Sequence, residues 1–402
     1  MSELLAVATL TDVSVDFCNA QNVLVKGEGK AIRVVTARRL LAAISQWNPD
    51  MPLAGLDLVI CENLELLDSA YELAVSLLRH VTQSSPTRYL GVSNSLNDPT
   101  DLAAWLGADP YTLHSFRPNN RDQSLTSSTQ SFTIPQSAVL FKAMAKPAHD
   151  AIQVATHNES AILFVPSRGQ CRLVALDLIT QSALGTETEK GYLPPWIDDE
   201  SLGNHLLRLK DRSLSDLVSR GIGIFHEGIQ GPDRNLILDL YTEGIIRVLV
   251  VPRESCWTLP VRAAVVVVMG TQYFHADADG PERHLRDYEP ADVVRMQGRA
   301  VQFSGSGHFN LFCQAESRDI ITRFLNEGLP LESRLLETQD LVSWYNNQRK
   351  KGWILDKQQG VAALSFTFLA QRISSNPFYY DAVSRSLDEN LSRIIDKLEL
   401  EV

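Results

Sequence analysis

Residues 221–257 decide the fold, and they read GIGIFHEGIQGPDRNLILDLYTEGIIRVLVVPRESCW. Two short runs of apolar, mostly β-branched residues, GIGIF (221–225) and IRVLVV (246–251), predict buried strands. The amphipathic stretch RNLILDLYTEG (234–244) between them has the length of a helix and ends at a glycine. This order of strand, helix and strand predicts a parallel β-sheet covered by helices on both faces.

The same alternation extends in both directions along the chain, which predicts an α/β protein with more than one lobe. A stretch rich in Ser, Thr, Gln and Asn (118–137) interrupts it and predicts a linker or an edge segment between two lobes. After about Leu335 the strand pattern stops, and the remaining residues predict a small, separate helical domain. Further strands are expected in IRVVT (32–36), LDLVI (56–60), RYLGV (88–92), AILFVP (161–166), AAVVVVM (263–269) and HFNLFC (308–313).

The composition indicates a globular protein of two or three domains. The chain has 402 residues, 44% of them hydrophobic, and a net charge of −11 from 37 basic and 48 acidic residues. Such a composition excludes a disordered chain, and the acidic balance argues against nucleic-acid binding by bulk charge. No apolar run reaches the roughly 18–20 residues of a membrane span, and the N-terminus lacks the basic region of a secretory signal.

No metal or phosphate motif of a known kind is complete. The five cysteines and nine histidines show no zinc-binding spacing, so we expect no metal site and reduced thiols. The pair Gly29-Lys30 lacks the Gly five residues earlier and the following Ser or Thr of a phosphate loop, and a strand follows it. We therefore expect a turn before a strand there. A Rossmann-type enzyme is disfavoured, since no GxGxxG follows a first strand.

Residues 221–257 resemble the second RecA-like lobe of superfamily-two DExH RNA helicases of the Ski-like group. In that family a strand ends in His-His-Ala-Gly or a variant of it, and this chain has Phe225-His226-Glu227-Gly228 there. A later strand leads to a motif ending near Ser255-Cys256-Trp257. Other segments resemble family motifs in the family order. These are LFVPSRGQC (163–171), RMQGRAVQF (295–303), PTDLAAWLG (99–107), FRPNNR (116–121), SNS (93–95), LPLESRL (329–335) and RISSNPFYY (372–380).

The resemblance implies two RecA-like lobes with parallel sheets, the first of them partial, followed by a mostly helical winged-helix domain. The expected boundaries are 1–125, 126–335 and 336–402. Within the family, the chain most resembles the degenerate C-terminal cassette of the tandem-cassette spliceosomal helicases that unwind the U4/U6 duplex. The alternative is the related helicase of the activating signal cointegrator complex.

Departures from the family pattern fall on the parts that hydrolyse ATP. In place of the Asp that holds magnesium, the chain has Cys61, and thiols are poor partners for this hard ion. Glu62, which orients the attacking water in the family, is retained, whereas the family's His is replaced by Leu64. The alternative interpretation of Cys61 is purely structural, as a small buried residue at the end of a strand.

Two further departures lie in the second lobe. Thr258 stands where the family has a Gly after the Trp, and Gln302 stands where it has the arginine finger, which is worth roughly 10³–10⁵ in rate in phosphoryl-transfer enzymes. Arg299 is retained, and it either contacts a phosphate or forms a salt bridge on a helix surface. Truncation would not explain Cys61 or Gln302.

The resemblance also implies RNA-binding positions. A first-lobe motif of the family touches the sugar-phosphate backbone, and its place is taken here by Thr36, Arg38 and Arg39. In the second lobe, His226 occupies an expected RNA-binding position. The alternative for the two arginines is a solvated helix start.

We therefore expect a catalytically inactive helicase cassette that serves as a protein-interaction and regulatory module in pre-mRNA splicing, in the nucleus. Its partners would be splicing factors and an adjacent active cassette, with weak RNA contact at most and no cofactor. The alternative is an active ATP-dependent RNA helicase whose phosphate loop lies upstream on a longer chain, with ATP and Mg²⁺ as ligands.

Overall fold

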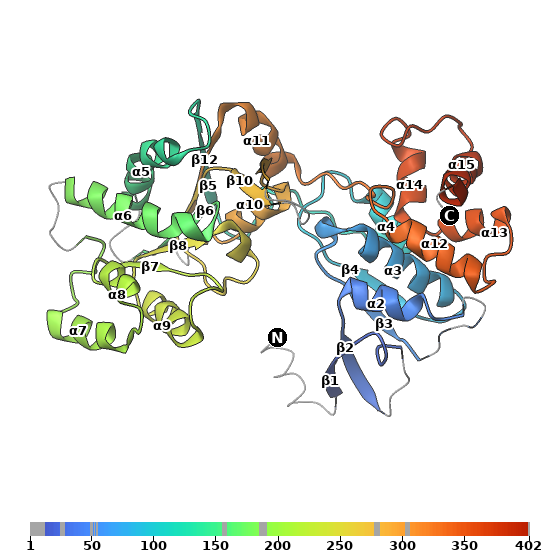
Figure 1. Cartoon of the computed structure of the whole chain (residues 1–402), viewed down its shortest axis with the longest axis horizontal. Helices are drawn as coiled ribbons and strands as arrows, with labels where there is room; N and C mark the ends of the chain where they lie inside the picture. Colours follow the sequence, from blue (N-terminus) through green and yellow to red (C-terminus); the bar gives the residue numbers. More distant parts are fainter. Residues whose placement is uncertain are drawn as a thin grey trace. The chain divides into compact units, whose positions relative to one another are not determined.

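The computed structural model describes residues 13–24, 29–48, 51, 53, 55–154, 159–184, 191–276, 282–301 and 306–400. The chain forms two compact units, which we describe separately (Figure 1). Unit 1 comprises Met1–Arg117 and Gly328–Val402, and unit 2 comprises Pro118–Glu327. The predicted α/β class is confirmed. Among the described residues, no helix is both long and apolar enough to cross a membrane.

Unit 2 is built on a six-stranded sheet in the order β5-β12-β9-β6-β8-β7, and all of its described strand pairs are parallel. The central strands are fully buried apolar runs, because a parallel sheet has helices on both faces. The strands are β5 (Leu125–Phe132), β6 (Ala161–Val165), β7 (Ile222–Ile224), β8 (Val248–Pro252), β9 (Val265–Met269) and β12 (Gly307–Gln314).

Two hydrophobic clusters show which helices cover which face of this sheet. Alternate strand residues such as Leu163 and Val250 pack with α5 (Ala138–Gln153), α6 (Arg168–Leu184) and α8 (Arg212–Val218). Their neighbours in sequence, such as Phe164 and Val251, pack on the opposite face. That face is covered by α9 (Gly231–Thr242), α10 (Pro290–Gln297) and α11 (Arg318–Glu327). A further helix, α7 (Asp199–Arg208), comes between α6 and α8 in the sequence.

Two parts of unit 2 are more polar. The stretch expected as a linker or an edge segment contains β5. This strand pairs with β12 and stands at the end of the sheet order, so the edge interpretation is confirmed. The strands β10 (Gln272–Ala276) and β11 (Arg283–Asp287) form an antiparallel pair outside the main sheet.

Unit 1 contains two parallel pairs of strands, β1 (Val13–Phe17) with β2 (Lys30–Val34) and β3 (Leu58–Cys61) with β4 (Arg88–Gly91). Lys30 opens β2 directly after Gly29, which has a φ of 87°. The strand expected there is therefore confirmed, and the residues of the turn before Gly29 lie outside the described residues. The helices α2 (Ala37–Ile44) and α3 (Ser69–Val81) pack against Val59 and Tyr89, one face of the β3–β4 pair.

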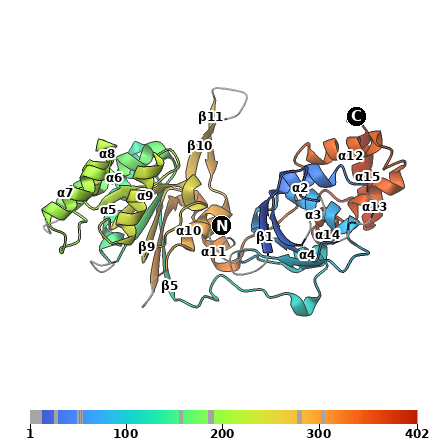
Figure 2. The same cartoon turned by 90° about the horizontal axis from the view of Figure 1, so that it is seen from below.

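The C-terminal helices belong to the same unit (Figure 2). They are α12 (Asp340–Lys350), α13 (Lys357–Leu364), α14 (Phe368–Ser375) and α15 (Leu387–Leu400). Leu73 of α3 lies in their hydrophobic core. The Trp105 indole of α4 (Thr100–Leu106) donates to the carbonyl of Phe366 over 3.1 Å. The expected boundaries at 125 and 335 and the winged-helix assignment stay predictions.

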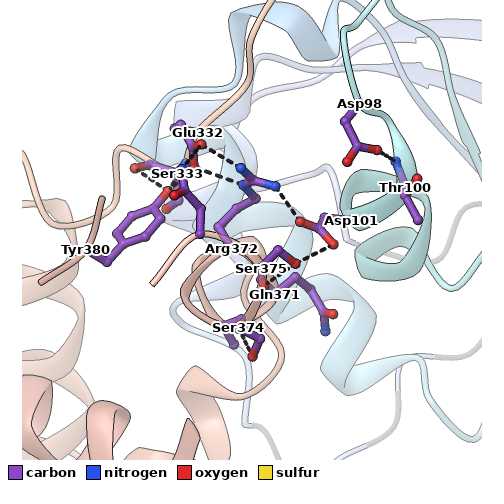
Figure 3. A network of polar contacts seen from close by, with 12 residues as sticks. Asp98, Thr100, Asp101, Glu332, Ser333, Gln371, Arg372, Ser374, Ser375 and Tyr380 are labelled. Carbon is purple, nitrogen blue, oxygen red and sulfur yellow. Dashed lines mark hydrogen bonds and ion pairs between the residues drawn. The ribbon is translucent and has the colours of Figure 1, made fainter. Parts of the chain in front are cut away.

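A polar network also holds α14 within unit 1 (Figure 3). The Arg372 guanidinium donates to Glu332 through Nε at 2.9 Å and Nη2 at 2.6 Å, and to Asp101 of α4 through Nη1 at 2.5 Å. Glu332 also accepts from the Tyr380 hydroxyl at 2.8 Å and from the Asn376 side-chain amide at 2.8 Å. One cation thus links two carboxylates from distant parts of the sequence.

Candidate functional site

In unit 1, the position expected to hold magnesium lies at the end of β3. Cys61 is only 2% exposed, and burial raises the pKa of its thiol to about 11. The thiol is therefore neutral near pH 7, and it offers sulfur where Mg²⁺ prefers oxygen. These residues do not fit a magnesium site. The structural interpretation of Cys61, as a small buried residue, agrees with its burial.

Glu62 follows Cys61 and is exposed, with its backbone carbonyl accepting from the Tyr71 hydroxyl at 2.9 Å. Leu64, in the place of the family's His, is buried and 1% exposed. The next residue, Glu65, accepts from the backbone and the side-chain amide of Asn94 at 3.2 and 2.7 Å. A carboxylate–amide pair therefore connects this segment to residues 93–95, although the His is absent.

The three RNA-binding candidates of unit 1 lie at the start of α2. Thr36 is the exposed N-cap residue, and its side chain makes no capping bond. Arg38 is 73% exposed and pairs with Asp340 at 3.8 Å, and Arg39 donates to the carbonyl of Cys18 at 3.4 Å. Exposed pairs of this kind contribute little to stability. The geometry leaves both the RNA interpretation and the solvated-helix interpretation open.

In unit 2, charged side chains meet where the parallel strands end. Arg168 follows β6, Glu227 follows β7, and Glu254 and Ser255 follow β8. Arg168 donates through Nε to Glu254, and its Nη2 lies 3.7 Å from Glu227. These four residues and Thr258 are called the edge cluster below.

Glu227 is the main acceptor of the edge cluster. Its carboxylate accepts from the Ser255 hydroxyl at 2.8 Å and from the Thr258 hydroxyl. Partial burial opposes ionisation, but these hydrogen bonds and the positive charge of Arg168 lower the pKa of Glu227 below its usual value. Glu227 is therefore a carboxylate at neutral pH, and it is already bound by donors of its own chain.

His226 lies beside this cluster and is partly buried. Burial and the nearby Arg168 lower the pKa of His226, so the ring is neutral at pH 7. Its Nδ1 accepts from the backbone N–H of Gly228 at 3.1 Å. A Cβ at Gly228 would lie 3.0 Å from that nitrogen and 3.2 Å from Nη1 of Arg168, so the glycine permits this close packing.

Arg168 and His226 also line a cavity of about 440 Å³. Arg172 and Lys210 add two cations to its wall. Asp233 contributes a carboxylate there, which accepts from the backbone N–H groups of Lys210 and Asp211 at 3.2 and 3.1 Å. The cavity wall thus carries both cationic and anionic groups.

A second polar centre lies under the segment after β8. Asp292 of α10 is 6% exposed and accepts from Arg253 at 2.6 Å and from the Trp257 indole at 2.8 Å. The Arg253 guanidinium also lies over the Tyr273 ring, 3.9 Å from its centroid. This centre fixes the backbone that presents Ser255.

Arg299 follows α10 and is partly buried, and burial together with the nearby Arg295 lowers its pKa. Its Nη2 donates to the carbonyl of Cys256 at 3.1 Å, while its buried Nε has no hydrogen-bond partner. Gln302, the expected arginine-finger position, lies outside the described residues.

The candidate residues fall on both units. Cys61 and Glu62 adjoin each other in unit 1, and His226 lies with the edge cluster in unit 2. Sequence reasoning missed the role of Arg168 and Glu254, although their position directly after predicted strands was a usable signal. Among the described residues, no group of three or more His, Cys, Asp or Glu side chains could hold a metal ion.

Curated proteins similar to this chain include RNA helicases. A DExH-box ATP-dependent RNA helicase of Arabidopsis thaliana is 31% identical over 91% of this chain. The U5 small nuclear ribonucleoprotein 200 kDa helicase of Homo sapiens is 29% identical over 95% of it, and pre-mRNA-splicing factor brr2 of Schizosaccharomyces pombe is 30% identical over 87%. This chain is related to the Ski-like DExH-box RNA helicases. No protein-family profile matches it.

The resemblance expected from the motifs is thus confirmed for the family, and the choice of cassette stays a prediction. The helicase-related chain spans only 17, 18 and 16% of the length of these three relatives. Two of them carry splicing or the U5 ribonucleoprotein in their names.

Proposed function

We propose that this chain is a catalytically inactive helicase cassette that acts as a protein-interaction and regulatory module in pre-mRNA splicing. Cys61 carries the proposal, because a buried neutral thiol stands where the family's magnesium-holding carboxylate is expected. Phosphoryl transfer depends on neutralising the negative charge of the phosphates. Without a bound Mg²⁺, the site would lack the divalent cation that contributes most to this neutralisation.

The edge cluster supports the same proposal from unit 2. Its arginine and its two hydroxyls are bound by carboxylates of the same chain. The overall charge of −11 suits protein partners better than RNA. By relation to the splicing helicases, the partners would be splicing factors and an adjacent active cassette, and the location would be the nucleus.

The first test is ATP hydrolysis by the native polypeptide, tagged in cells and purified at whatever length it has. We expect no turnover above background with or without single-stranded RNA. Turnover that Glu62→Gln abolishes, but that Glu337→Gln preserves, would instead establish the alternative of an active helicase. Glu337 is a matched control, since it is an exposed carboxylate of unit 1.

The second test addresses partners. The tagged polypeptide should co-purify with U5 ribonucleoprotein components from nuclear extract, in amounts that high salt reduces without abolishing. Recovery as a free cytoplasmic species without these components contradicts the splicing role.

A further inference from the structure

The edge cluster has the composition of an anion-binding site. Two hydroxyls and a guanidinium converge on one point at the carboxyl ends of parallel strands, where open α/β sheets bind their ligands. Hydroxyl and arginine donors of this kind are also the usual partners of phosphate oxygens. In this chain the convergence point is occupied by the carboxylate of Glu227.

Burial explains why the occupant matters. Ser255 is 0% exposed, and a buried hydroxyl without a hydrogen-bond partner is costly. Glu227 supplies its acceptor at 2.8 Å. The same carboxylate remains 38% exposed, and Arg168 is 48% exposed. The bound carboxylate is therefore the surface that a ligand approaching this edge would meet.

Glu227 and Thr258 together close the cluster. Thr258 stands where the family pattern has Gly after the Trp. Although 31 positions separate the two residues in sequence, their side chains hydrogen bond to each other. A glycine at position 258 could not make this contact, so the departure at Thr258 gains its partner in Glu227.

We infer that Glu227 is an internal anion, which fills the donor cluster at the carboxyl edge of unit 2 and excludes a nucleic-acid phosphate from it. Glu254 assists by holding Nε of Arg168. This inference deepens the proposed function, since it names the residues that keep the module from binding RNA at this edge. Removal of both carboxylates frees Arg168, next to the cations Arg172 and Lys210 of the adjoining cavity.

The test is the affinity of the full chain for a fluorescent single-stranded RNA, measured by anisotropy without nucleotide. The variant Glu227→Ala with Glu254→Gln should bind more tightly than the wild type. One new contact to a single-stranded phosphate corresponds to about a fivefold gain at 0.1 M salt, because affinity scales as roughly the −0.7 power of salt concentration per contact. The salt slope should steepen by about 0.7.

Controls separate a local effect from a change in total charge. The variant Glu200→Gln with Glu243→Gln also removes two exposed carboxylates from unit 2, neither in the cluster nor in the wall of the adjoining cavity, and should bind like the wild type. Adding Arg168→Gln to the test variant should reverse the gain. Glu227→Gln keeps an acceptor for Ser255 and Thr258, so it serves if the alanine variant fails to fold.

An equal gain in the control variant, or no gain in either Glu227 variant, overturns the inference. These outcomes do not depend on ATP hydrolysis. An inactive module that binds RNA tightly through Arg168 in its wild-type form would overturn the inference and leave the absence of catalysis intact. A hydrolysing chain whose RNA affinity responds to Glu227 would do the reverse.

Discussion

Replacement of Arg372 by Met should destabilise unit 1 strongly. In the wild type, this guanidinium donates to Glu332 and Asp101, and the three side chains are only 13, 20 and 17% exposed. Met preserves much of the length and the apolar stem but removes the cation. Two partly buried carboxylates are then left close together without a positive partner, which is unfavourable to both.

The magnitude follows from the burial of the network. Removing one partner of a buried ion pair costs about 3–5 kcal/mol. In a unit of roughly 150–250 residues, each kcal/mol lowers the unfolding midpoint by about 2–4 °C, so the expected shift is about 6–20 °C. Arg372→Lys should recover only part of it, because a single ammonium cannot reproduce the fork of hydrogen bonds to both carboxylates.

Calorimetry of the full chain measures the shift, and amide hydrogen exchange in α14 assigns the transition to unit 1. Arg323→Met is the matched control. Arg323 pairs with Glu327 on the surface of unit 2, where both side chains are largely exposed, so the unit 1 transition should not move. A midpoint for Arg372→Met within about 2 °C of the wild type would refute the reasoning.

Three further predictions concern buried groups. Burial raises the pKa of the Glu72 carboxyl from 4.5 to about 7. Because the unfolded state releases this proton at lower pH than the folded state, unit 1 should lose roughly 3 kcal/mol of stability as the pH rises from about 4.5 to 7. Glu72→Gln should flatten that part of the stability curve measured by urea unfolding. All five cysteines are buried, so Ellman's reagent should label them slowly at pH 8 and label five per chain in denaturant. Asp292→Ala, which leaves Arg253 without its carboxylate, should cost unit 2 about 3–5 kcal/mol in the same urea experiment.

The sequence was most informative where burial is complete. AAVVVVM could be predicted as a strand because a run of β-branched residues suits a strand covered on both faces, and it forms β9. The stretch LTSSTQSF forms β5 at the edge of the same sheet, and its polar composition is compatible with a loop. The exposed strand β11 gives an even weaker signal, since all five of its residues are exposed.

The candidate site was predictable in position but not in contacts. The ends of predicted parallel strands indicate where side chains gather, and Arg168, His226 and Glu254 follow such strands. Nothing in the sequence indicates that Glu227 accepts from Thr258, because that contact depends on the path of the chain after β8. The hydrogen bonds of Asp292 could not be predicted from the sequence either, since its partners Arg253 and Trp257 follow a strand that is distant from it in sequence.

The surroundings of Cys61 and of Ser255 bear on the proposal of an inactive cassette. A buried hydroxyl left without a hydrogen-bond partner would cost about 1–3 kcal/mol. Instead, the buried Ser255 hydroxyl is bonded to Glu227, and the thiol of Cys61 replaces a charged group at a position that is now closed to solvent. Both changes suit a stable folded surface and oppose the binding of phosphate and magnesium. This combination is what the proposed function requires, since the proposed module would be recognised by proteins and would not turn over ATP.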